Sequence, residues 1–172
     1  GEVFAKLAEV DTLNTKTYLE EGFEKFPQSQ SILIGLINYY LKANESTDRL
    51  FELLDKAKVN EPNNASLYYV EGNIRAQLGD IDKAVVAYEK CAEINPEYEY
   101  GYIGEGTMFY NKASEVQTKA QEELDDAKYM ALVKEFEADL KSCIAPFEKA
   151  FEITKAENVK VGVAEYLKTA YY

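Results

Sequence analysis

Residues 65–98 read ASLYYVEGNIRAQLGDIDKAVVAYEKCAEINPEY, and this stretch decides the fold. Apolar residues recur at helical spacing in its first half, stop at Gly79 and Asp80, and recur in its second half. Gly79 suits the left-handed position that ends a helix, and Asp80 suits the N-cap of the next helix, where its carboxylate can accept from free amides. We therefore predict a helix, a tight turn and a second helix, followed by Pro96.

Prolines mark a repeat of the same length elsewhere in the chain. Pro62 and Pro96 lie 34 positions apart, and Pro27 precedes Pro62 by 35. A similar stretch of sequence precedes each of the three prolines. A fixed period of this size is typical of stacked helical repeats. An ordinary helical bundle also has amphipathic helices, but it does not require prolines at a constant spacing. The period therefore favours the repeat stack over the bundle.

Residues 65–98 resemble a tetratricopeptide repeat (TPR), a helix-turn-helix unit. Two positions depart from that family's pattern: Glu71 stands where Leu is usual, and Arg75 stands where Tyr is usual. The resemblance implies an all-α fold, a right-handed α-α superhelix of about nine helices. Small residues in it would allow two helices to approach closely while large ones fill the space beside them. The matching residues are Tyr68, Gly72, Ala84, Tyr88, Cys91 and Pro96.

We expect a single repeat domain over residues 1–172. The unit 31–64 matches the family more loosely, through Ile34, Ile37, Leu41, Leu50, Leu54, Ala57 and Pro62. The chain starts as though a helix were entered midway, and its last helix has no second helix after it. We therefore expect a fragment of a longer protein. The expected units are 1–30 (partial), 31–64, 65–98, 99–157 and 158–172 (partial).

The fourth unit is predicted to contain an inserted helical hairpin over residues 113–140. Its small residues Gly106 and Cys143 lie 37 positions apart, whereas the matching Gly72 and Ala84 lie 12 apart, so 25 residues are extra. Some bacterial TPR proteins look similar in having a lengthened unit. The sequence itself leaves the location unknown, and the resemblance implies the bacterial cell envelope or periplasm. The extra residues form two apolar stripes: Ala113, Val116, Ala120 and Leu124, then Tyr129, Leu132, Val133, Phe136 and Leu140.

Charge and composition exclude several classes of function. The chain has 31 acidic and 19 basic residues, a net charge of −12, which disfavours nucleic acid and anionic membranes as partners. No signal peptide or membrane-spanning segment is recognisable in the sequence. There is no histidine to act as a general base or metal ligand, and we expect Cys91 and Cys143 to be buried, inert thiols. We therefore predict no catalytic activity, no cofactor and no metal site.

The TPR resemblance implies a ligand in a groove lined by the first helices of the units. The members that bind acidic chaperone tails use a cation clamp there, but Gly35, Tyr69 and Ile103 stand at the cationic positions, so we expect no such clamp. Ile32 and Ser66 also fall on this expected groove. Tyrosines suit half-exposed contact, although some of them will pack between repeats. The groove candidates are Tyr39, Lys42, Tyr69, Asn73, Gln77, Tyr100, Thr107, Tyr110 and Tyr166.

Two functions stay open at this point. One is a protein-interaction scaffold that binds an extended peptide or a protein segment in the tyrosine-lined groove. The other is a structural or oligomerisation module that acts through the long hairpin or the open ends of the stack. The analogy with the family favours the first.

Overall fold

The computed structural model describes residues 1–27, 29–42 and 47–171, and within this part the side chains of Gln30, Ile37, Leu41 and Lys42 are not described. Over the described residues the chain forms nine α-helices and no strand, which confirms the all-α prediction. The helices are α1 (Glu2–Val10), α2 (Thr15–Lys25), α3 (Gln30–Lys42), α4 (Asp48–Asn60), α5 (Ala65–Gln77), α6 (Ile81–Ile94), α7 (Glu99–Glu122), α8 (Asp126–Ile153) and α9 (Glu157–Tyr171).

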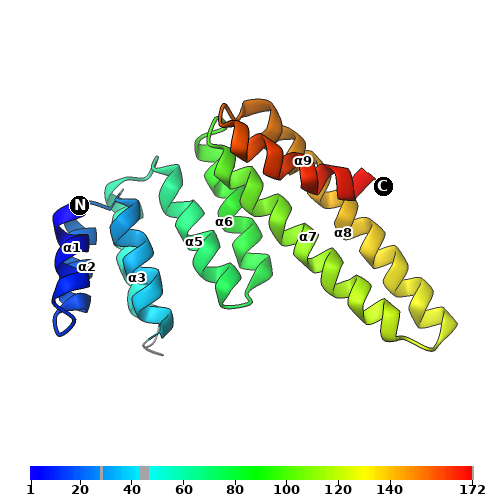
Figure 1. Ribbon diagram of the computed structural model, residues 1–172, viewed down its shortest axis with the longest axis horizontal. Coiled ribbons are helices and arrows are strands. Elements are labelled where there is room, and N and C mark those ends of the chain that lie inside the picture. Colours follow the sequence, from blue (N-terminus) through cyan, green and yellow to red (C-terminus); the bar gives the residue numbers. More distant parts are fainter. Residues whose placement is uncertain (28, 43–46, 172) are drawn as a thin grey trace.

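The helices form a row of antiparallel pairs that runs from the N-terminus to the C-terminus (Figure 1). We call α1, α3, α5, α7 and α9 the first helices, and α2, α4, α6 and α8 the second helices. The α7–α8 pair extends well past its neighbours, and α9 lies across the base of that pair (Figure 1). The lengthened fourth pair anticipated from the sequence is therefore present as two long helices.

The turn between α5 and α6 forms at the predicted position. Gly79 has a φ of 77°, the left-handed conformation that glycine adopts without strain. Asp80 is the N-cap residue of α6, but its side chain makes no capping hydrogen bond, so that part of the prediction is wrong. Its carboxylate instead accepts from Lys83 at 2.8 Å and lies 3.5 Å from the Arg75 guanidinium. The Asp80 carboxylate therefore interacts mainly with two cationic side chains.

The core of the repeat is the ring of Tyr88. It lies on α6, 2% exposed, next to the fully buried Ala84 and Cys91. A Cβ atom added at Gly72 on α5 or at Gly104 on α7 would come within 3.0 Å of this ring, a separation that real Cβ atoms essentially never show. The ring, which extends from α6, therefore fits between α5 and α7 only because each of these helices presents glycine to it. This confirms the predicted close approach at Gly72 and Ala84.

Glu71 and Arg75, the two residues that depart from the TPR pattern, interact with each other. Glu71 accepts from Arg75 at 3.0 Å and from Lys58 of α4 at 2.6 Å. The Arg75 guanidinium lies over the ring of Phe51, 4.4 Å from its centroid. The Glu71 and Lys58 side chains are only 15% and 14% exposed. A charged network thus joins α4 to α5 at the position where the family usually places apolar residues.

The α7–α8 pair repeats the packing of the α5–α6 pair and then continues beyond it. A Cβ at Gly106 would clash with the Phe147 ring, as one at Gly72 would with Tyr88. However, α7 and α8 have 24 and 28 residues, compared with 13 and 14 for α5 and α6. The additional length lies at the far end from this contact. The pair is therefore longer than the α5–α6 pair at that end, and the insertion of residues 113–140 stays a prediction.

The first predicted stripe of the hairpin is largely correct, since Ala113, Val116 and Ala120 are buried. Leu124 does not belong to it: α7 ends at Glu122, and Leu124 lies in the turn with its side chain 97% exposed. In the second stripe, Tyr129 is also exposed, and the others are half-buried: Leu132, Val133, Phe136 and Leu140. The hairpin therefore buries a narrow seam and leaves its tip in solvent.

Alanine substitutions at Gly72 and Gly162 form a matched pair that tests the packing around Tyr88. Gly72→Ala should lower the free energy of unfolding by about 1–3 kcal/mol, because the new methyl group meets a buried ring that has no room to move. Gly162→Ala on α9 meets nothing within 4 Å, so it should raise stability by up to about 1 kcal/mol through helix propensity. Urea denaturation measures both. Equal stability of Gly72→Ala and the parent would contradict the packing described.

The hairpin should be the least protected helical part among the described residues. Its projecting half has only the partner arm for burial, so its amides should open locally at low cost. Hydrogen exchange followed by mass spectrometry should show amides of residues 120–131 exchanging well before those of 84–91. Equal protection of the two segments would indicate that something covers the hairpin in solution.

Candidate functional site

Three tyrosines form a contiguous aromatic surface where α5 meets the start of α7. Tyr69 lies on α5, Tyr98 is the N-cap residue of α7, and Tyr100 lies in the first turn of α7. The ring centroids are 5.6 Å apart for Tyr69 and Tyr100, 6.0 Å for Tyr69 and Tyr98, and 5.5 Å for Tyr98 and Tyr100. Tyr100 is 36% exposed, and the other two are half-buried. We call these three residues the tyrosine cluster.

The tyrosine cluster rests on the core of the repeat. The Tyr69 ring lies 6.0 Å from that of Tyr88, whose hydroxyl donates to Asn73 Oδ1 at 2.8 Å. Asn73, a groove candidate from the sequence, is therefore occupied with an internal hydrogen bond. Burial raises the pKa of Tyr98 to about 12, so its hydroxyl stays protonated and can donate a hydrogen bond at neutral pH. The cluster can thus offer ring faces and a hydroxyl donor.

Two further groove candidates form a separate aromatic contact. Tyr110 on α7 and Tyr166 on α9 have ring centroids 4.9 Å apart. The Phe147 ring of α8 stacks on Tyr166 at 4.8 Å with an interplanar angle of 11°. This contact joins three helices and is half-buried. It therefore indicates a packing role for Tyr110 and Tyr166 in this part of the chain.

The remaining groove candidates are Tyr39, Lys42, Gln77 and Thr107. Tyr39 contacts Tyr40 at 5.7 Å and lines a separate hollow formed by α1, α2 and α3, together with Gly35. Gln77 is exposed and Thr107 is half-buried, while the side chain of Lys42 lies outside the described residues. Ile32 was expected on the groove, but it is completely buried, so that expectation is wrong. It belongs to the same buried cluster as Ala8 of α1 and Leu19 and Phe23 of α2.

Tyr98 is the residue of the cluster that the sequence reasoning missed. It precedes α7, and the groove positions carried over from the family lie within first helices. The Tyr-Glu-Tyr pattern over residues 98–100 could have indicated this contact. Tyr98 has an extended backbone and Tyr100 lies in the first turn of the helix, so their rings can meet although the residues are two positions apart. The rings do meet here, with an interplanar angle of 61°.

The cysteines, the acidic side chains and the helix lengths were predicted to carry no reactive thiol, metal site or membrane span. Both cysteines are buried, which confirms the prediction; burial raises the pKa of Cys91 to about 12 and that of Cys143 to about 11, far from the thiolate form. Within residues 1–27, 29–42 and 47–171, no group of three His, Cys, Asp or Glu side chains could hold a metal ion. None of the helices over these ranges has the length and apolarity that crossing a bilayer requires.

Glu105 on α7 has an unusual electrostatic environment. Burial and the nearby Glu89 carboxylate raise its pKa to about 7. Glu71, which lies at the matching position of α5, accepts from Lys58 of the preceding second helix. Ala92 stands where that lysine would fall on α6, 34 positions later in the sequence. Glu71 therefore pairs with a cation, whereas Glu105 has no ion-pair partner among the residues that the structure describes.

Comparisons with known proteins agree with this architecture. Residues 65–98 match the tetratricopeptide repeat family. A TPR repeat-containing protein of Methanocaldococcus jannaschii is 27% identical over 112 residues, which is 64% of this chain and only 17% of that protein. A solved structure from Bacteroides ovatus ATCC 8483, described as a candidate protein-binding protein, is similar with a TM-score of 0.58 at 16% identity, over 97% of this chain and 87% of that one. The structural likeness concerns the fold.

Glu105 gives a pH-dependent prediction. Because its folded-state pKa lies above the ordinary value of 4.5, the folded protein retains a proton that the unfolded chain releases, so stability should fall as pH rises from about 4.5 to about 7. Glu105→Gln removes this dependence. The variant should melt close to the parent at pH 4.5 and a few degrees above it at pH 8, as measured by circular dichroism. An equal shift at both pH values would contradict the raised pKa.

Proposed function

We propose that the chain, whose residues 65–98 match the tetratricopeptide repeat family, is a non-catalytic scaffold that binds an extended peptide or protein segment across the tyrosine cluster. The observation that carries this proposal is the contact among the rings of Tyr69, Tyr98 and Tyr100, which leaves Tyr100 36% exposed. Rings that hold one another in place lose little freedom when a ligand binds. Binding there therefore costs little conformational entropy.

The chemistry of the cluster suits a peptide. Tyrosine provides a large apolar face together with a hydroxyl that can reach a backbone carbonyl, which is why it is enriched at protein interfaces. Gln77 on α5 and Thr107 on α7 offer further polar groups on the first helices. The candidate protein-binding description of the structurally similar Bacteroides ovatus protein supports the same class of function.

Peptides selected from a random library against the protein provide the test. Tyr100→Ala should weaken the binding of the selected peptides by about tenfold or more, as expected for an aromatic residue at the centre of a binding surface. Tyr129→Ala is the matched control, since Tyr129 is also an exposed tyrosine but lies on the long hairpin. Fluorescence anisotropy measures both affinities. Selected peptides that bind Tyr100→Ala as tightly as the parent would contradict the proposal.

A second candidate function is self-association through the long hairpin. Its tip exposes three large apolar side chains, Leu124 at 97%, Met130 at 53% and Tyr129 at 44%. Exposed apolar groups gathered at the end of a projecting element are typical of contact sites. Light scattering at increasing concentration decides this candidate: a monomer throughout would leave only the scaffold function.

A further inference from the structure

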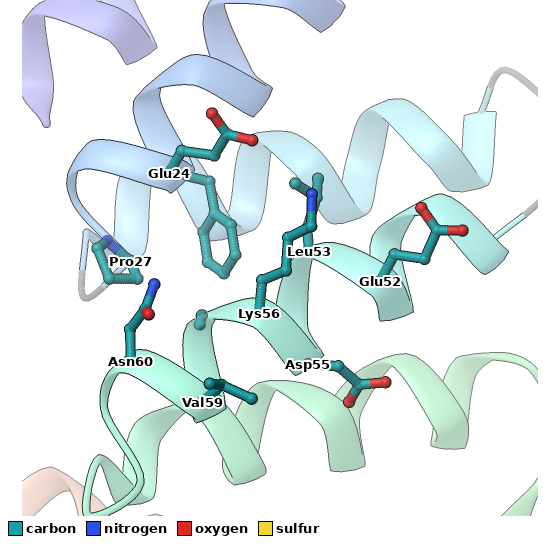
Figure 2. Close-up of a pocket in the computed structure, with 10 residues that line it drawn as sticks. Glu24, Pro27, Glu52, Leu53, Asp55, Lys56, Val59 and Asn60 are labelled. Carbon is teal, nitrogen blue, oxygen red and sulfur yellow. The ribbon is translucent and has the colours of Figure 1, made fainter.

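A hollow of about 650 Å³ lies between α2 and α4, on the side of the second helices. Its volume falls within the range of roughly 300–1,000 Å³ that is typical of binding pockets. Figure 2 shows Glu24 on α2 facing Lys56 on α4, with Pro27 and Asn60 at one end and Glu52 toward the other. The tyrosine cluster lies on α5 and at the start of α7, so the two sites use different helices.

The floor of the hollow is apolar. Phe23 from α2 and Leu53 and Ala57 from α4 line it, and all three belong to the buried core. Val59 stands at its edge with 81% of its surface exposed. An apolar floor that continues into an exposed apolar edge offers burial to a side chain from outside.

The rim of the hollow is predominantly acidic. Glu24, Glu52 and Asp55 are exposed around it, and Lys56 is the one cation among its described lining residues. Glu52 and Asp55 pair with Arg49 and Lys58 at 3.2 Å, but these are solvent-exposed carboxylates in pairs one helical turn apart, which contribute little. Their free oxygens remain available to a cation that approaches from solvent.

We propose that the α2–α4 hollow binds a basic amphipathic segment of a partner protein. An apolar side chain of the segment would enter between Phe23 and Leu53, and lysine or arginine side chains beside it would reach Glu24 on one wall and Glu52 and Asp55 on the other. The net charge of −12 draws such a segment toward the domain, and the rim fixes its position. This surface is independent of the tyrosine cluster.

Lys56 places a positive charge at this site, which opposes the binding of a cationic ligand. Among the described residues it has no ion-pair partner, and Figure 2 shows its amine directed toward α2, over the hollow. A bound cationic segment would meet this like charge. Lys56→Ala should therefore tighten the binding of a basic segment, by about threefold for the loss of one repulsive contact in solvent.

The probe for the test is a fluorescein-labelled peptide of leucine and lysine only, with leucine at helical spacing over about 14 residues, or four turns. Fluorescence anisotropy compares two triple variants that change net charge equally. Glu24→Gln, Glu52→Gln and Asp55→Asn together should weaken binding by about tenfold. The matched control changes three exposed acids at the hairpin tip, Glu122→Gln, Asp125→Asn and Asp126→Asn, and should weaken it by less than about threefold.

Amide chemical shifts locate the bound peptide and separate this proposal from the function proposed above. Chemical-shift changes concentrated on residues 15–27 and 48–60 would support binding at the α2–α4 hollow. The same changes should appear in the Tyr100→Ala variant. Changes concentrated on the tyrosine cluster, equal losses in the two triple variants, or no tightening in Lys56→Ala would each overturn it. Peptide binding at the tyrosine cluster can fail or succeed without affecting this result.

Discussion

The fit of the Tyr88 ring between α5 and α7 is the constraint on which the centre of the molecule depends. The ring is buried against Gly72 on one side and Gly104 on the other, and side chains at either position would push the helices apart. Its hydroxyl is satisfied by Asn73, so the ring is fixed at both ends. Because Tyr69 packs against this ring, the geometry of the tyrosine cluster is set by the core beneath it.

Ion pairs also connect neighbouring units of the repeat. Glu20 of α2 accepts from Arg49 of α4 at 3.1 Å, and Glu71 of α5 accepts from Lys58 of α4. The Lys58 and Glu71 side chains are 14% and 15% exposed, so removing one of these two partners would leave a poorly solvated charge, whereas Arg49 is 37% exposed and its pair is partly screened by solvent. At the matching position on α7, burial and the Glu89 carboxylate raise the pKa of Glu105 to about 7. Charge pairing therefore differs from unit to unit while the packing repeats.

The sequence predicts those parts of the fold that depend on local or periodic signals. The turn at Gly79 and the contact at Gly72 follow from conformational freedom and from the repeat period, and both are present. Side-chain destinations were less predictable, because they depend on neighbours from other units. Ile32 was assigned to a groove and lies in the core, and Asp80 was assigned to capping and pairs with Lys83. The α2–α4 hollow had no sequence signal, since its two walls lie about 30 residues apart in the chain.

The long helix pair shows which parts of a unit are free to vary. In an antiparallel pair the base contacts the neighbouring units, whereas the tip contacts only the partner arm. The additional residues lie beyond the Gly106 and Phe147 contact, so the base keeps the geometry of the preceding unit. Beyond the base, Ala113, Val116 and Ala120 are small enough for α8 to pack closely along α7. A unit can therefore gain a projecting element without disturbing the stack, provided that the two arms bury a seam of their own.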